Sequence, residues 1–477
     1  MTAPNLRRNY LYTVAIQLLS MLTPLVTAPY LARVLGSDGV GTYSYVLSVA
    51  TVFSLFAALG LSAYGLREVS RARDDGDAAS HLFWELTALR LVTTLVTVAV
   101  YAALCFRVQR WQIYAAVGLL ILATGVDLTW FFQAIERFGA LMVRHLAVKL
   151  MGVVLVFTLV QDEGDVTTYA LIQTGSTLLS NLLLWPSLRG VVKPPSKPIR
   201  PLAHLRPSLV YFVPAVATSV YTVLDKTMLG AITGDMAQNG YYESAHKIIR
   251  LLMAVITSLN LVVGVRTSYL FGQNREGEVR RHLLDTYRFT CALALPLCAG
   301  LIACGEGFAV VFFGGDFAVA GQLLRWFSPL LFLIGTSNVL GSLYLTPGGY
   351  RRLSNRAIIT GAVVNLMLNA VLIPRFGGVG AVVASLAAEG TITALYLRLS
   401  HPFVAVGELL RIAFHYSVYA LAMFVPVYVL ARRMPYAWSA LLLQVAVGVA
   451  VYALLLIICR DPVWQVWKNL RKSGETE

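Results

Sequence analysis

Apolar runs long enough to cross a bilayer recur along the whole chain of 477 residues. A membrane-spanning helix needs ~20 predominantly apolar residues, and short polar segments separate these runs. We place predicted spans at 11–32, 41–63, 83–105, 112–133, 145–160, 167–187, 208–231, 240–264, 286–305, 320–345, 356–373, 379–399, 411–431 and 438–459. Because 57% of the residues are hydrophobic and only 13% are charged, the chain exceeds the apolar content of a soluble core. The pattern predicts an all-α polytopic membrane protein with about fourteen transmembrane helices.

Lys and Arg are concentrated in alternate connections between the predicted spans. Short cytoplasmic loops carry an excess of these residues, which sets the orientation of a membrane protein. With the N-terminus inside, the outer connections hold only Arg107, Arg110, Arg375, Arg432 and Arg433, besides Arg33 at a helix end. Both termini are therefore expected in the cytoplasm. We attribute the net charge of +14 to the Lys and Arg residues that set the membrane topology and to contact with anionic membrane lipids. No motif for binding nucleic acid accompanies it.

A proline-rich basic segment, 190–207, interrupts the apolar pattern after six predicted helices. Its prolines cannot continue a helix, and its charges cannot enter lipid. It divides the chain into four predicted parts: an N-terminal lobe 1–189, the cytoplasmic linker 190–207, a C-terminal lobe 208–400, and two final helices with a tail, 401–477.

The two sides of this linker contain similar helical hairpins. Leu35-Gly36 followed by Gly41 resembles Leu229-Gly230 followed by Gly240, and a fainter third copy spans 373–381. Repeated hairpins favour a transporter with two related lobes around a central cavity. Helix–turn–helix repeats are common in membrane proteins, and such similarities can arise by chance. A chance similarity is therefore the alternative that stays open.

Three blocks of sequence resemble one transporter family: Ala28 to Asp75, Asp225 to Ile249 (DKTMLGAITGDMAQNGYYESAHKII) and Ser337 to Glu389. They are similar to the Wzx-type oligosaccharide-lipid flippases, the polysaccharide transporter branch of the MOP exporter superfamily. The resemblance implies fourteen helices and export of an undecaprenyl-diphosphate-linked oligosaccharide from the inner to the outer leaflet of a bacterial plasma membrane. One departure is Asp225-Lys226, where this family often has Asp-Arg. The charge is kept there, but a guanidinium fork for phosphate is absent.

A diphosphate headgroup cannot cross hydrocarbon unaided, so a flippase needs a hydrated, cationic path. Glu243, Lys247 and Arg250 are spaced i, i+4 and i+7 and therefore share one helix face. The predicted headgroup contacts are Arg33, Lys226, Lys247 and Arg250, partly balanced by the carboxylates Asp225 and Glu243. The alternative is that Glu243 and Asp225 form structural ion pairs while Arg33 extends to the interface.

Three further charges fall inside predicted spans. Arg90 and Asp127 lie at similar depth on neighbouring helices, which predicts an ion pair; we favour a structural or gating latch, because a matched pair neutralises itself. Glu389 lies near the middle of the twelfth span without a partner nearby in sequence. It is a candidate to carry a coupling proton or to stabilise a helix contact.

The sequence contains no constellation typical of an enzyme or of a cofactor site. There is no P-loop, no zinc motif and no histidine triad, and the five cysteines lack metal-ligand spacing. We therefore expect a transporter with no cofactor; the coupling ion, H⁺ or Na⁺, stays open. A cation-coupled drug antiporter of the same superfamily is the second hypothesis, and a membrane glycosyltransferase or polymerase is the third. A polymerase and glycosyltransferases are also considered as partners.

Overall fold

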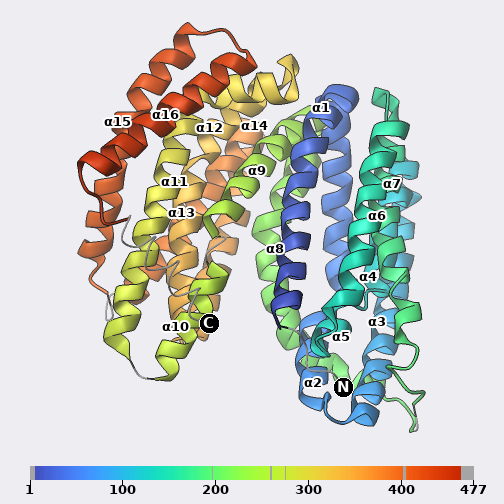
Figure 1. Cartoon of the computed structure of the whole chain (residues 1–477). Coiled ribbons are helices and arrows are strands. Elements are labelled where there is room, and N and C mark those ends of the chain that lie inside the picture. The colour runs from blue at the N-terminus through green and yellow to red at the C-terminus, as the bar shows by residue number, and fades with distance from the viewer. Residues whose placement is uncertain (1–5, 196, 258–259, 274, 401–403, 464–477) are drawn as a thin grey trace. The chain divides into compact units, whose positions relative to one another are not determined.

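The computed structural model describes residues 6–195, 197–257, 260–273, 275–400 and 404–463. The described residues form helices joined by turns and short loops, without a β-strand (Figure 1). By their internal packing they divide into two compact units. Unit 1 contains 1–231 and 235–240, and unit 2 contains 232–234 and 241–477.

Unit 1 is built from eight α-helices that mostly run up and down beside one another (Figure 1). Their bounds are α1 (Leu6–Ala58), α2 (Leu61–Ala72), α3 (Gly76–Cys105), α4 (Trp111–Gly125), α5 (Thr129–Ala134), α6 (Phe138–Leu159), α7 (Val166–Leu182) and α8 (Leu205–Thr233). Short 3₁₀ turns lie at Glu163–Asp165, Trp185–Leu188 and Pro201–His204.

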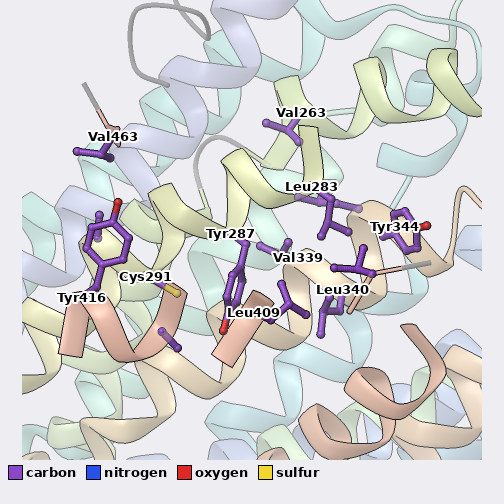
Figure 2. Packing of buried hydrophobic residues seen from close by; sticks show 14 of the residues in the cluster. Val263, Leu283, Tyr287, Cys291, Val339, Leu340, Tyr344, Leu409, Tyr416 and Val463 are labelled. Carbon is purple, nitrogen blue, oxygen red and sulfur yellow. The ribbon is translucent and has the colours of Figure 1, made fainter. Parts of the chain in front are cut away.

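Unit 2 contains the remaining helices, and α9 enters it at Tyr241. Their bounds are α9 (Met236–Thr257), α10 (Asn260–Gly272), α11 (Glu276–Phe313), α12 (Ala318–Phe327), α13 (Pro329–Ser337), α14 (Arg351–Ser400), α15 (Val406–Arg433) and α16 (Trp438–Ile458). A 3₁₀ turn occupies Gly315–Phe317, and a π-helical segment, Asn338–Leu345, continues α13. The main core of unit 2 is formed by residues of α10, α11, the π-helical segment, α14, α15 and α16, and Figure 2 shows Tyr287, Cys291 and Leu340 within it.

Glycines in the left-handed region end or break the helical hairpins. Gly36 (φ 64°) interrupts α1, and Gly377 (φ 53°) interrupts α14. Gly234 (φ 66°) lies between α8 and α9. Only glycine adopts these dihedrals without steric strain. All three glycines fall in or just beyond the repeated hairpins predicted from sequence.

Seven described helices are long and apolar enough to cross a membrane, and a bent pair, Gly315–Phe327 with Pro329–Leu345, makes eight. Two of the seven, Thr23–Ala72 and Arg351–Ser400, each have 50 residues. At ~1.5 Å per residue they far exceed a hydrocarbon core of ~30 Å, so each glycine break allows two crossings. The protein is a multi-span membrane protein; the total of about fourteen spans stays a prediction.

The linker predicted from its prolines is attached to α3. Lys193 donates from its backbone N–H to Ser80 Oγ at 3.1 Å, and its carbonyl accepts from Trp84 Nε1 at 2.9 Å. Its ammonium lies 2.7 Å from Asp77 Oδ1, and this hydrogen bond raises the pKa of Lys193. The linker is therefore part of unit 1 rather than a free tether.

A largely buried ionic cluster holds the other end of the linker. Glu85 of α3 accepts from the backbone N–H of Arg200 at 2.8 Å through Oε1, and its Oε2 lies 2.9 Å from His204 Nε2. The opposite ring nitrogen of His204 lies 2.9 Å from the hydroxyl of Tyr64. One carboxylate thus joins α3 to the 3₁₀ turn that leads into α8.

Helix α8 also belongs with unit 1, through to Ala231. Thr227 Oγ1 donates to Ser48 Oγ of α1 at 2.8 Å, and Gly230 packs directly against the ring of Tyr45. The sequence division assigns 208–231 to the C-terminal lobe, whereas in this structure these residues pack with the N-terminal helices. The difference arises because the glycine and hydroxyl face of α8 matches α1, a contact that composition along the chain does not display.

Candidate functional site

The predicted ionic face of α9 is present in unit 2. Glu243 Oε1 lies 3.8 Å from Lys247 Nζ and 3.7 Å from Arg250 Nη2. The carboxylate is buried, with 7% of Glu243 exposed, whereas 58% of the Arg250 side chain is exposed. One carboxylate is therefore shared between two cations, and these three side chains together carry a formal net charge of about +1. We call Glu243, Lys247 and Arg250 the α9 triad.

Aromatic packing positions the α9 triad. Tyr242, directly beside Glu243 in sequence, is buried and packs edge-to-face on Phe327 of α12, with ring centroids 5.0 Å apart. His246 lies 5.7 Å from the same Phe327 ring. Residues one apart on a helix point about 100° from each other. Anchoring this aromatic face therefore fixes the direction in which the ionic face points.

The other predicted headgroup contacts lie in unit 1. Arg33 is exposed on α1, one turn before the break at Gly36. Asp225 is buried in α8, with 3% exposed, and its neighbour Lys226 is half-buried. The backbone carbonyl of Lys226 accepts from Asn239 Nδ2 at 3.2 Å. That these groups converge with the α9 triad on one surface stays a prediction.

The predicted pair Arg90 and Asp127 is in contact. Arg90 Nη2 lies 3.9 Å from Asp127 Oδ2, and Arg90 Nη1 donates to the backbone carbonyl of Asp127 at 2.9 Å. Nη2 also donates to Ser62 Oγ of α2 at 2.7 Å. Arg90 is 2% exposed, so these three bonds join α2, α3 and the α4–α5 junction. The latch role stays a prediction.

Asp127 does not lie inside a continuous helix, as the predicted span 112–133 implied. Helix α4 ends at Gly125 and α5 begins at Thr129. Asp127 Oδ1 accepts from the backbone N–H of Thr129 at 2.9 Å and from its hydroxyl at 2.6 Å. A short polar side chain that binds backbone groups two residues later initiates a new helical turn and ends the previous one. The break between α4 and α5 therefore arises from local hydrogen bonds of Asp127. The prediction missed it because it relied on hydropathy alone.

Glu389 is buried in the second half of α14, with 7% exposed. Ser337 Oγ donates to Glu389 Oε2 at 3.5 Å, a long hydrogen bond from the end of α13. Within the part of the chain that the structure describes, no Lys, Arg or His is recorded within ion-pair distance of it. The π-helical segment begins one residue after Ser337, and π-helical turns often occur at functional sites. Its coupling role stays a prediction.

One feature of unit 1 has no counterpart in the sequence prediction. Helix α6 begins at Phe138, seven residues before the predicted span 145–160. Arg144, which lies just outside the predicted span, lies inside this helix, as do His145 and Lys149. His145 and Lys149 line a cavity of ≈ 220 Å³ bordered by α1, α6 and α7. The predicted start at 145 directly follows Arg144, because a charged residue lowers the hydropathy of the window.

These observations define a class of protein: a multi-span membrane protein whose described residues form helices, with ion pairs inside its helical units. A family model described as polysaccharide biosynthesis protein matches residues 6–264, more than half of the chain. The chain belongs to this family. The resemblance to Wzx-type flippases of the MOP superfamily is thereby confirmed.

Relatives with curated names are transporters rather than enzymes. A putative O-antigen transporter of Escherichia coli is 25% identical over 82% of this chain and 96% of its own length. A probable low-salt glycan biosynthesis flippase of Haloferax volcanii is 20% identical over 79% of each chain.

Solved structures share the fold. The lipid II flippase MurJ in an inward closed conformation has a TM-score of 0.74, with 16% identity, over 95% of this chain and all of that chain. An inward-facing multidrug resistance MATE transporter of the MOP superfamily has a TM-score of 0.61, with 14% identity, over 82% of this chain and 96% of that chain.

Proposed function

We propose that this protein is a flippase that moves an undecaprenyl-diphosphate-linked oligosaccharide from the cytoplasmic to the outer leaflet of the bacterial plasma membrane. Support comes from family membership and from the names of the relatives, an O-antigen transporter and a glycan flippase. A drug antiporter is the weaker hypothesis, because the relatives matched by sequence over about four-fifths of the chain are named for glycan transport.

The observation that carries the proposal is the α9 triad. A lipid diphosphate brings concentrated negative charge into the membrane, and a flippase must replace its hydration with fixed cations. Glu243 holds Lys247 and Arg250 at nearly equal distances, 3.8 and 3.7 Å. Two cations gathered on one helix face, with 58% of the Arg250 side chain exposed, favour an anionic ligand. Arg33 and Lys226 are proposed as further contacts for the headgroup.

Orientation and energy supply complete the proposal. Both termini are placed in the cytoplasm, as the distribution of Lys and Arg suggests. Glu389 is proposed to couple transport to H⁺ or Na⁺, since a buried carboxylate without a recorded cationic partner among the described residues can bind either. Anionic lipids, a polysaccharide polymerase and glycosyltransferases are proposed partners.

The test replaces both cations of the α9 triad with alanine. Each lost charge-assisted contact is worth roughly 1–3 kcal/mol, which is about 5- to 150-fold in headgroup binding. Purified protein is reconstituted into vesicles with a fluorescent lipid-linked oligosaccharide, and the fraction accessible in each leaflet is followed with time. The Lys247→Ala, Arg250→Ala variant should flip more slowly, whereas Arg250→Lys should keep more activity than Arg250→Ala.

The matched control is Arg352→Ala, which removes an exposed cation of α14 in the same unit. It should flip at the rate of the unmodified protein. All variants are first compared by insertion, elution profile and thermal stability. Unmodified rates from the double variant would refute the assignment of these cations to the headgroup.

A further inference from the structure

A small cavity lies wholly within unit 2, toward the C-terminal end of α11. Its volume is ≈ 130 Å³, and its lining comes from α11, α12, α15, α16 and the connection between the last two helices. Helix α11 packs against α12, α15 and α16 (Figure 1). A Cβ on Gly307 of α11 would lie 3.1 Å from the ring of Tyr436, so this glycine lets the ring pack closely on α11. No member of the α9 triad lines this cavity.

A buried amide of the lining has no hydrogen-bond partner in the part of the chain that the structure describes. Gln444 is 6% exposed in the apolar helix α16 and lines the cavity. Tyr452, also buried in α16, donates its hydroxyl to the carbonyl of Ala292 at 2.9 Å. The amide of Gln444 makes no such bond to any described residue. Burying amide donors and an acceptor without partners is unfavourable, so the partner of Gln444 is expected inside the cavity.

Hydrogen bonds orient the charged part of the lining. Glu306 Oε2 of α11 lies 2.9 Å from Arg325 Nη1 of α12, and Glu306 Oε1 accepts from the hydroxyl of Tyr436 at 3.2 Å. Arg432 Nε of α15 donates to the hydroxyl of Tyr428 at 3.0 Å. A carboxylate has about four acceptor positions and a guanidinium has about five N–H donors. Both kinds of side chain therefore keep hydrogen-bonding capacity for a ligand.

The composition of the lining discriminates between ligand classes. Arg325 and Arg432 repel a cation, whereas Glu306 neutralises Arg325 and repels an anion. Amide, carboxylate and guanidinium together supply donors and acceptors, which suits hydroxyl groups, since each hydroxyl both donates and accepts. The ring of Tyr436 is 53% exposed beside them and offers an apolar surface to the C–H face of a sugar. A neutral ligand with several hydroxyls fits this set best.

We propose that this cavity is a sugar-binding site of unit 2. Gln444, Glu306 and Arg432 bind hydroxyl groups of the sugar, and Tyr436 packs on its ring. The inference rests on the proposed function for its physiological ligand, a sugar residue of the lipid-linked oligosaccharide. It extends that function, because the α9 triad is assigned to the diphosphate and this cavity to the glycan.

The test measures binding of soluble sugars to the full-length protein. Saturation-transfer difference NMR detects weak ligands, and the detergent is one without a sugar headgroup. The probes are the methyl glycosides of glucose, galactose, mannose, rhamnose and N-acetylglucosamine. At least one glycoside should bind saturably, which gives its Kd. Glycerol and inorganic pyrophosphate, at equal concentration and matched ionic strength, should not displace it.

Variants of the lining then locate the bound sugar. Gln444→Leu removes the amide, suits the apolar surroundings of α16, and should raise the Kd by about two- to tenfold. Tyr436→Ala should weaken binding by a similar factor, whereas Tyr436→Phe keeps the ring and should retain most of it. The matched control compares neighbouring arginines: Arg432→Ala should weaken binding, and Arg433→Ala, an exposed residue outside the lining, should not. All variants are first compared by elution profile and thermal stability.

Three results would overturn the proposal. Absence of saturable binding by every glycoside would show a cavity that holds only water around Gln444. Displacement by pyrophosphate would assign the site to an anion instead. A Kd unchanged by both Gln444→Leu and Tyr436→Ala would place the sugar elsewhere on the protein. The NMR assay needs no transport, so the two proposals can fail separately. Sugar binding by a protein that flips no lipid-linked oligosaccharide would refute the flippase, whereas normal flipping without sugar binding would refute only this site.

Discussion

Exchanging Asp127 for Asn isolates the charge of the Arg90–Asp127 pair. Asparagine keeps an oxygen that can accept from the backbone N–H and the hydroxyl of Thr129, so these two hydrogen bonds are preserved. The backbone carbonyl of residue 127 still accepts from Arg90 at 2.9 Å, and Ser62 still accepts at 2.7 Å. The substitution therefore removes only the counter-charge 3.9 Å from Nη2.

The two partners should respond unequally. The gross attraction of unit charges near 4 Å is ~4 kcal/mol at an effective dielectric constant of 20, and a buried charge left alone costs about 3–5 kcal/mol in stability. The Arg90 side chain is 3% exposed and the Asp127 side chain 20%. Asp127→Asn leaves the buried arginine without its counter-charge. Arg90→Met leaves the Asp127 carboxylate without its counter-charge, but that carboxylate keeps two hydrogen bonds from Thr129. Asp127→Asn should therefore be the more destabilising, with Arg90→Met at about 1–3 kcal/mol.

The free energy of unfolding in mild detergent, monitored by tryptophan fluorescence, is measured for all four members of a double-mutant cycle. The double variant should be more stable than the sum of the single effects implies, with a coupling energy of about 1–3 kcal/mol. Additive effects, or an Asp127→Asn variant as stable as the unmodified protein, would refute the ion pair. A latch role would appear in the leaflet assay as a change in flipping rate at conditions where every variant is folded.

Three further predictions concern close packing, the linker and coupling. A Cβ on Gly41 would overlap the carbonyl oxygen of Met236, so Gly41→Ala should destabilise unit 1 by about 1–3 kcal/mol in the same denaturation assay. The control Gly175→Ala, with open space around it, should leave stability unchanged. Equal stability of the two variants would refute the contact. Glu85→Ala should release the linker and speed tryptic cleavage there by about tenfold, seen by gel and mass spectrometry; an unchanged cleavage rate would show that other contacts hold it. Glu389→Gln keeps the side-chain shape and should abolish the response of flipping to an imposed H⁺ or Na⁺ gradient; an undiminished response would exclude this carboxylate from coupling.

The sequence pattern was sufficient to predict those properties that depend on residues close together along the chain. The 3.6-residue period of the α-helix places Glu243, Lys247 and Arg250 on one face whatever surrounds the helix, and the structure shows them in ionic contact. Hydrophobic runs likewise predicted the helices themselves, because burying backbone polar groups in lipid requires helix. The similar depth of Arg90 and Asp127 sufficed to pair them.

At Asp127 the sequence contained a local indication of a helix break, but the hydropathy of the flanking residues outweighed it. Asp side chains often bind nearby backbone N–H groups in turns, yet the apolar residues on either side favoured one long span. The start of α6 was misplaced for the opposite reason. The predicted span began at His145, directly after the charged Arg144, whereas the helix begins at Phe138 and continues through Arg144.

The sequence by itself determined that this protein is a bundle of membrane helices, where its glycine-rich hairpins fall, and which charges share a helix face, since hydropathy and helical periodicity act over a few turns. Only the tertiary structure decided that α8 and the linker pack with unit 1, that Glu85 holds His204, and that Lys149 lines a cavity between α1, α6 and α7. These features depend on side chains brought together from helices far apart in sequence. Whether a charge is solvated, paired or left to bind a ligand is set by those neighbours, because its free energy depends on the surrounding dipoles and charges rather than on its place along the chain.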